Sequence, residues 1–190
     1  MRQSSSRDMA RIAIFFAVML VLEVVSRTIF NLIPILPIQP TIMFIPVVIA
    51  AVVYGPKIGG ILGALMGITY IIEATILYDP TNSFLFSPFV QHGSVYSVLI
   101  SMIPRILLGI TPYYTYKLVH NSFGRYLAGA VGALTNTILV MTGLFLFFPN
   151  EFPGGFMAFI TLVLGVNALV ECLLSTIFTG VITERLEKMS

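Results

Sequence analysis

The chain has 190 residues, of which 57% are hydrophobic and 9% are charged, with a formal net charge of +2 and a mean hydropathy of +0.99. Soluble domains usually contain about 25% charged residues, so this composition excludes an ordinary soluble domain and indicates an integral membrane protein. The single cysteine, Cys172, excludes an intramolecular disulfide, and two histidines do not provide the spacing of a metal site.

The N-terminal stretch MRQSSSRDMARIAIFFAVML combines basic residues with an apolar run, as a secretory signal does. No small-residue cleavage pattern follows it, and Glu23 and Arg27 occupy the place where such a pattern would lie. We therefore interpret this stretch as the start of a retained first span.

Apolar runs of the length that a membrane helix needs follow one another along the chain. The proline cluster PILPIQP (34–40) ends the first run, YGPKIGG ends a short second one, and a polar stretch, 78–97, separates the third from the fourth. These runs predict an all-α integral membrane protein, a bundle of six transmembrane helices in one domain covering residues 1–190. The predicted spans are about 12–33, 41–54, 58–77, 98–116, 126–148 and 156–182.

Positive charge outside the spans falls on one side of this bundle. The basic residues on the side of the N-terminus are Arg2, Arg7, Arg11, Lys57, Lys117, Arg125, Arg185 and Lys188. The opposite loops, 34–40, 78–97 and 149–155, contain no lysine or arginine. Because cytoplasmic loops carry the excess of lysine and arginine, we expect both termini to be cytoplasmic.

Polar groups also occur within the spans, where they are energetically costly and usually face the bundle interior or a water-filled cavity. They are Glu23, Arg27, Glu73, Arg105 and Glu171, with the amides of Asn136 and Asn167. At a rise of about 1.5 Å per residue, none lies in the cytoplasmic third of its span. This distribution predicts a pocket that opens to the outer side.

Arg105 follows a proline in the apolar run SMIPRILLGI (101–110). An arginine at a helix centre costs about 3 kcal/mol on insertion, and Arg105 has no charged neighbour within its own helix. It therefore needs a partner from another helix or from a ligand, and a guanidinium is well shaped for a carboxylate. A binding role is favoured for Arg105.

The other intramembrane groups have two interpretations each. Glu23 and Arg27 are four residues apart and can simply neutralise each other, while Glu73 can reach the outer surface. Asn167 and Glu171, also four apart, can pair with Arg105 to hold helices together or can contact a ligand.

The stretch 78–97 is long for a connection and rich in aromatic residues, namely Tyr78, Phe84, Phe86, Phe89 and Tyr96, with His92 among them. Such aromatics form either an interfacial belt or a lid over a small organic ligand. The candidate substrate-binding residues are accordingly Arg105, Asn136, Asn167, Glu171, Arg27, Glu73, His92 and Tyr96.

Small residues four apart form two rows, which allow helices to approach closely. Gly59, Gly63 and Gly67 are expected to pack within the bundle. Ala13 and Ala17, in AIFFA, provide either internal packing or a docking face for another membrane protein.

Sequence motifs of common enzymes are missing from the chain. There is no Walker A loop, no GxSxG, no HExxH and no aspartate pair within the spans. We expect neither an enzyme nor a cofactor, metal or nucleic-acid partner, and active transport would need an energy source from another protein.

Several stretches together resemble the substrate-binding S components of energy-coupling factor (ECF) vitamin transporters, over nearly the whole chain. They are AIFFA, IPVVIAAVVYGPKIGGILG (45–63), IPRILLG (103–109), GALTNTILV (132–140) and NALVE (167–171). The resemblance implies a vitamin-binding subunit in a bacterial cell membrane, with a membrane-embedded T component and two cytoplasmic ATPases as partners. It also implies that Ala13 and Ala17 contact the T component.

The IPRILLG and TNT pieces are most similar to pantothenate-type members, with riboflavin-type members close behind. Pantothenate carries a carboxylate, which suits Arg105 or Arg27, whereas riboflavin is larger, flat and neutral. The alternative from another class is a membrane scaffold, in which the intramembrane charges only hold the helices together. This alternative predicts no saturable binding of a small molecule.

Overall fold

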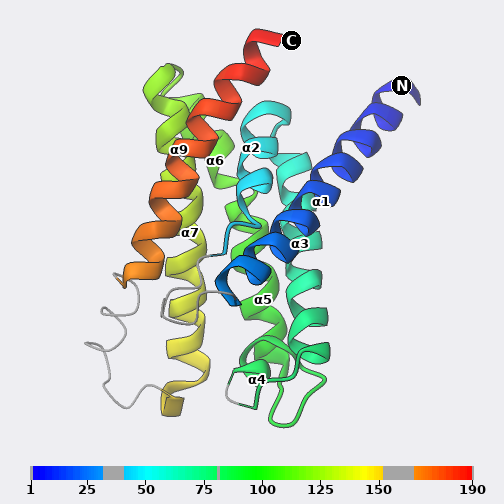
Figure 1. Ribbon diagram of the computed structural model, residues 1–190, viewed down its shortest axis with the longest axis vertical. Helices are drawn as coiled ribbons and strands as arrows, with labels where there is room; N and C mark the ends of the chain where they lie inside the picture. Colours follow the sequence, from blue (N-terminus) through cyan, green and yellow to red (C-terminus); the bar gives the residue numbers. More distant parts are fainter. Residues whose placement is uncertain (1, 32–40, 81, 152–164, 190) are drawn as a thin grey trace.

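The computed structural model describes residues 2–31, 41–80, 82–151 and 165–189, and the regular secondary structure of these residues is entirely helical (Figure 1). The helices are α1 (Arg2–Asn31), α2 (Ile45–Tyr54), α3 (Pro56–Ile76), α4 (Ser83–Phe86), α5 (Val95–Leu108), α6 (Thr111–Leu118), α7 (Ser122–Phe147), the 3-10 turn η1 (Pro149–Glu151) and α9 (Val166–Met189). The predicted all-α class is confirmed. The proline cluster 34–40 and the first part of the sixth predicted span lie outside the described residues.

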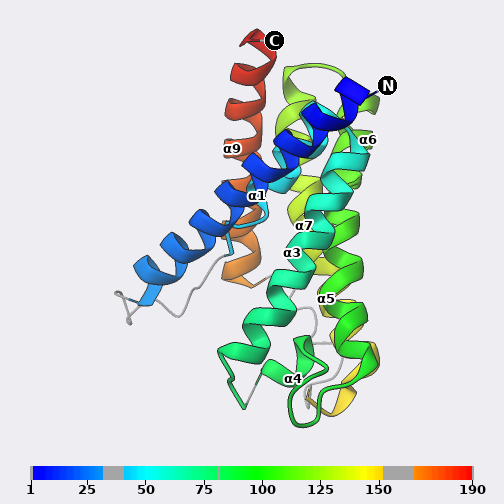
Figure 2. The ribbon, with the colours of Figure 1, turned by 90° about the vertical axis from the view of Figure 1, so that its right-hand side faces the viewer.

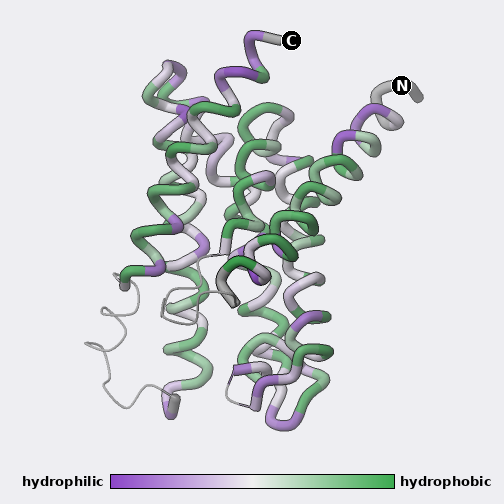
Figure 3. The backbone as a smooth tube through the Cα atoms, in the orientation of Figure 1, coloured by the Kyte–Doolittle hydropathy of each residue, from purple (hydrophilic) through white to green (hydrophobic). Residues whose placement is uncertain are grey.

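Five helical segments are long and apolar enough to cross a membrane: Ser6–Ile29, Pro56–Ile76, Val95–Leu118, Ser122–Phe147 and Val166–Lys188. The second predicted span corresponds to α2, which has 10 residues and therefore rises only about 15 Å. Hydrophobic segments run along the bundle between more hydrophilic ends (Figure 3).

The fourth predicted span, 98–116, is not one continuous helix. The chain turns at Gly109 and Ile110, between α5 and α6. Pro112 explains the break, because its ring would clash with the carbonyl of Leu108 in a continuous helix. Pro104, by contrast, lies inside α5 without ending it.

Both termini lie at the same end of the molecule, together with the α2–α3 turn and the α6–α7 connection (Figures 1 and 2). Gly55 makes the α2–α3 turn with φ of 97°, a conformation that favours glycine. The one-turn helix α4 lies at the opposite end. The basic residues outside the predicted spans thus gather at the end that carries the termini.

The hydrophobic core is centred on α2. Met43, Phe44, Val47 and Val48 are buried completely or nearly so, and all of α2 from Ile45 to Val52 is buried. Side chains of α1, α3, α5, α7 and α9 surround this short helix. Because α2 reaches only part of the length of its neighbours, this cluster lies in the half of the bundle nearer the termini, and a second, smaller cluster consists of Leu85, Ile100, Val140 and Leu144.

The glycine row of α3 packs closely against α5, as its spacing predicts. A Cβ on Gly63 would strike the carbonyl group of Arg105, and one on Gly67 would strike Ser101 and Met102. Gly59 meets the Gly109 carbonyl in the same way. The absence of side chains on this face therefore sets the distance between α3 and α5.

Replacing Gly63 by alanine should destabilise the protein, because the atoms that its methyl group meets belong to the rigid backbone. We expect the free energy of unfolding to fall by about 1–3 kcal/mol, seen as a lower melting temperature in detergent. Gly60→Ala is the matched control, since its nearest neighbours are side-chain atoms of Ile110 at 3.4 Å or more. Equal melting temperatures for the two variants would contradict the packing role of the row.

Candidate functional site

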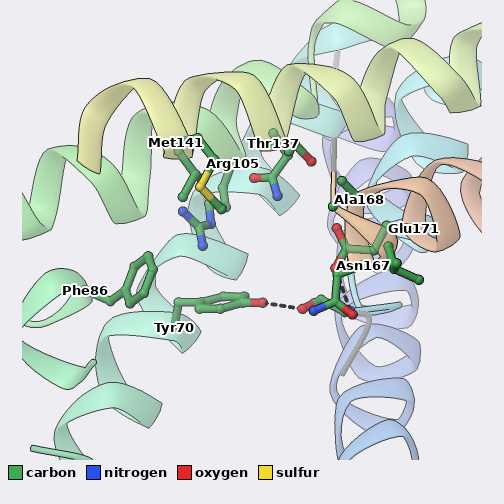
Figure 4. A pocket seen from close by; sticks show the side chains of 13 residues that line it. Tyr70, Phe86, Arg105, Thr137, Met141, Asn167, Ala168 and Glu171 are labelled. Atoms are coloured by element: carbon green, nitrogen blue, oxygen red, sulfur yellow. Dashed lines mark hydrogen bonds between the residues drawn. The ribbon is translucent and has the colours of Figure 1, made fainter. Parts of the chain in front are cut away.

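A cavity of about 510 Å³, here called the central cavity, lies among α3, α4, α5, α7 and α9. Four of the predicted site residues line it: Arg105, Asn136, Asn167 and Glu171. The other lining residues include Tyr70, Phe86, Thr137, Met141 and Ala168 (Figure 4). The cavity therefore combines one cationic, one anionic and several hydrogen-bonding groups with apolar walls, as small-molecule sites do.

Arg105 is 3% exposed, and Pro104 explains how its guanidinium is held. A proline has no N–H, so the carbonyl of Ile100, four residues earlier, lacks its helical donor. The Nη1 of Arg105 donates to that carbonyl oxygen at 2.7 Å. The two adjacent residues therefore act together: Pro104 leaves the Ile100 carbonyl oxygen without a backbone donor, and Arg105 donates a hydrogen bond to it.

The rest of the guanidinium faces aromatic rings instead of a carboxylate. Its carbon lies 4.5 Å from the centre of the Tyr70 ring and 5.6 Å from that of Phe86. Among the described residues Arg105 forms no salt bridge, and its buried Nε has no hydrogen-bond partner. Cation–π contacts offset part of the desolvation cost, but they leave hydrogen-bond donors available to an anion.

Glu171, in contrast, is held from the other side of the cavity. Its Oε1 accepts a hydrogen bond from the backbone N–H of Thr41 at 2.7 Å. The Tyr70 hydroxyl donates to Oγ1 of Thr41 at 3.1 Å, so Thr41 connects α9 to α3 (Figure 4). The suggested pairing of Asn167 or Glu171 with Arg105 does not form among the described residues.

Two amide side chains complete the polar lining. The Oδ1 of Asn136 is buried without a hydrogen-bond partner in the described part of the chain. Asn167 is exposed at the start of α9, on the cavity wall. A buried acceptor without a partner is unfavourable, so a ligand that donates a hydrogen bond to Asn136 would satisfy it.

Arg27 and Glu73 lie beside the central cavity instead of in it. Arg27 forms ion pairs with Glu23 in its own helix and with Glu73 in α3, the latter at 2.6 Å. The ion pair of Glu23 with Arg27, one of the two interpretations of their spacing, is present and extends to a third residue. This triad ties α1 to α3 next to a smaller cavity of about 170 Å³, which Arg27 and Glu73 line.

His92 and Tyr96 do not line either cavity among the described residues. His92 is exposed in the 87–94 loop with φ of 64°, and Tyr96 stacks on Phe147 with ring centres 4.5 Å apart. The aromatic residue of the 78–97 stretch that reaches the central cavity is Phe86. Ser101 positions it by donating to its carbonyl oxygen at 2.7 Å.

Sequence reasoning did not identify Thr41, Tyr70, Thr137 or Met141 as lining residues. Tyr70 had a detectable signal, because it lies three residues after Gly67 and so on the face of α3 that packs against α5. Thr41 had none, since its role comes from a backbone N–H.

Ala13 and Ala17 are both exposed on α1. Their row is therefore not buried within this chain. Among the described residues, no group of three or more His, Cys, Asp or Glu side chains is placed to hold a metal ion.

Apolar helices long enough to cross a membrane, with a cavity of small-molecule size among them, define a multi-pass membrane protein with an internal cavity that carries polar groups on its wall. The chain belongs to the family "ECF transporter, substrate-specific component", whose model matches residues 7–186. It is 38% identical over 193 residues to "Pantothenic acid transporter PanT" of Lactococcus lactis subsp. cremoris (strain MG1363), covering 99% of this chain and 97% of that protein. The family that the sequence resembled is thus the correct one.

The Thr41–Glu171 contact yields a prediction for the protein without ligand. Glu171→Ala removes the acceptor and leaves the Thr41 N–H without it, so we expect a loss of about 1.5–3 kcal/mol in the free energy of unfolding. Glu171→Gln keeps an oxygen acceptor and should lose clearly less. Melting temperatures of both variants in detergent measure this, and equal losses would mean that the negative charge, not the acceptor, matters.

Proposed function

We propose that this chain is the pantothenate-binding S component of an ECF importer and that the vitamin binds in the central cavity. The observation that carries the proposal is Arg105, a buried guanidinium with unused donors on the cavity wall and no carboxylate partner among the described residues. The name of the Lactococcus relative supports the choice of vitamin.

The chemistry of pantothenate matches the lining. Its carboxylate would accept charge-assisted hydrogen bonds from Arg105, which are worth roughly 1.5–3 kcal/mol. Its hydroxyl and amide donors would meet Glu171, Asn136 and Asn167, and its dimethyl carbon would lie against Val140 and Met141. Riboflavin, the alternative, is neutral and would leave the Arg105 charge without a partner.

The finer architecture belongs to the same proposal. One domain with six membrane spans has both termini in the cytoplasm, so that the central cavity receives vitamin from outside. Arg27 and Glu73 support the cavity from their triad with Glu23, and His92 and Tyr96 lie outside the binding set. A membrane-embedded T component docks on the exposed alanine row of α1, and two cytoplasmic ATPases supply the energy.

The anchoring role of Arg105 predicts a specific pattern of affinities in the purified protein. Arg105→Lys keeps the charge but loses the planar fork, and it should weaken pantothenate binding by about tenfold or more. Arg105→Gln should weaken it further. The alcohol analogue, which lacks the carboxylate, should bind wild type less tightly than pantothenate does, and its affinity should barely change in Arg105→Gln. Calorimetric titration of both ligands measures this.

Arg27→Gln is the matched control, because it removes a guanidinium from the neighbouring triad and should preserve the preference for the carboxylate. If Arg105→Gln loses affinity equally for the charged and the neutral ligand, and the ligand-free variant melts at a lower temperature, Arg105 has a structural role and does not anchor the carboxylate. A scaffold protein would show no saturable binding of either ligand.

The docking role of α1 is tested separately. Ala13→Trp or Ala17→Trp should leave pantothenate binding to the isolated protein nearly unchanged, because both positions are exposed and outside the cavity lining. Uptake in cells that contain the T component and ATPases should fall strongly, since a small-residue row loses close helix approach when filled. Ile14→Trp, at a neighbouring exposed position, is the control. Unchanged uptake in both alanine variants would remove the docking face from the proposal.

A further inference from the structure

A second cavity, of about 450 Å³, lies at the end of the bundle that carries both termini, and we name it the end cavity. Its polar and aromatic lining comprises Arg11, Tyr54, Tyr113, Tyr116, Lys117, His120 and the carboxylate Glu187. Tyrosine is enriched where membrane helices meet the polar headgroups, and lysine and arginine favour the same depth. The composition and the position both place this cavity at the membrane surface.

The charge balance of the end cavity is positive. The carboxylate that lines it, Glu187, accepts a hydrogen bond from the Tyr116 hydroxyl at 2.8 Å and forms an ion pair with Arg125 at 3.0 Å. Arg11 lies over the Tyr54 ring at 4.5 Å and pairs with Asp8 at 2.9 Å. Lys117 forms no salt bridge among the described residues, so its charge remains available at the cavity wall.

Next to the end cavity, on the side farther from the termini, lies a groove of about 330 Å³ that is lined only by apolar side chains and is here called the apolar groove. α1 contributes Phe15, Val18 and Leu22, and α9 contributes Phe178 and Ile182. The floor is formed by Ile42, which precedes α2, and by Ile45, Pro46 and Ile49 of α2, the helix that lies between α1 and α9 (Figure 1). No polar group of the described residues is available there to bind a hydrophilic ligand.

The end cavity and the apolar groove follow one another along α2, and the two together are here called the path. Phe15 of the groove contacts Tyr54 of the cavity edge to face, with ring centres 5.7 Å apart. On α1, Arg11 and Phe15 are four residues apart and therefore on one face. On α2, the groove ends at Ile49 and the cavity begins at Val52, one turn further.

We propose that this path binds one anionic phospholipid, with its phosphate in the end cavity and an acyl chain in the apolar groove. A basic pocket between membrane helices at the bilayer surface suits an anionic headgroup, and an adjoining apolar groove suits its chain. Charge complementarity selects the lipid class, because Lys117 and Arg11 offer donors to the phosphate while the groove accepts only hydrocarbon.

The lipid path is separate from the alanine row. At about 100° per residue, Ala13 and Ala17 lie roughly 150° around α1 from the groove residues Phe15, Val18 and Leu22. A lipid in the groove therefore leaves the alanine face free. This inference does not rest on the proposed vitamin, and its variants leave the central cavity untouched.

The test measures lipid bound to the purified protein by native mass spectrometry, with dioleoyl phosphatidylglycerol and dioleoyl phosphatidylcholine offered in equal amounts. Wild type should retain phosphatidylglycerol preferentially. Lys117→Gln and Arg11→Gln should each weaken its binding by about fivefold. Lys57→Gln is the matched control, because it removes an exposed lysine at the same end but outside the cavity. An equal loss in Lys57→Gln, or no preference in wild type, would overturn the proposal.

A second arm distinguishes a lipid from a soluble phosphate. Val18→Trp fills the groove from a half-exposed position and should lower phosphatidylglycerol binding while Lys117 and Arg11 remain. Millimolar sn-glycerol 3-phosphate should not displace the lipid from wild type, because it gains nothing from the groove. Complete displacement by glycerol 3-phosphate, or unchanged lipid binding in Val18→Trp, would show that the groove has no part and would refute a lipid site.

Discussion

The burial of one guanidinium in an apolar bundle is the constraint on which the site depends. Arg105 is tolerated there because Pro104 leaves the Ile100 carbonyl without a helical donor and because two aromatic rings cover the guanidinium. These contacts make its burial possible without supplying a counter-charge from the described residues. A site that keeps its cation unpaired gains affinity for an anion, since the protein does not have to break an internal salt bridge first.

The glycine row of α3 makes this arrangement geometrically possible. Gly63 lies against the carbonyl of Arg105 itself, and Gly67 lies one turn further along the same face. The next residue of that face is Tyr70, which covers the guanidinium. The close approach of α3 and α5 therefore brings the Tyr70 ring within cation–π distance of Arg105, and the same ring carries the hydroxyl that binds Thr41.

Composition and spacing predicted most of this fold, because lipid allows few alternatives to apolar helices. They also selected Arg105, Asn136, Asn167 and Glu171, since polar residues within spans are costly and so stand out. Composition and spacing did not predict the break between α5 and α6, where Pro112 interrupts the helix although the apolar run is continuous. Contacts made through the backbone, such as that of Thr41 with Glu171, leave no trace in residue type. The position of loop residues such as His92 could not be predicted either, because the sequence of a polar connection does not specify which side chains face the cavity.

The shortness of α2 explains why there is a cavity at all. With 10 residues it rises about 15 Å, half of the hydrocarbon thickness of roughly 30 Å, and its residues from Ile45 to Val52 are all buried in the half of the bundle nearer the termini. Thr41, which precedes the N-terminal end of α2, lines the central cavity and donates to Glu171. A full-length second span would fill this space with side chains. The same short helix, flanked by α1 and α9, also forms the floor of the apolar groove between these two helices. One half-length element therefore produces both the polar cavity deep in the bundle and the lipid path at its surface.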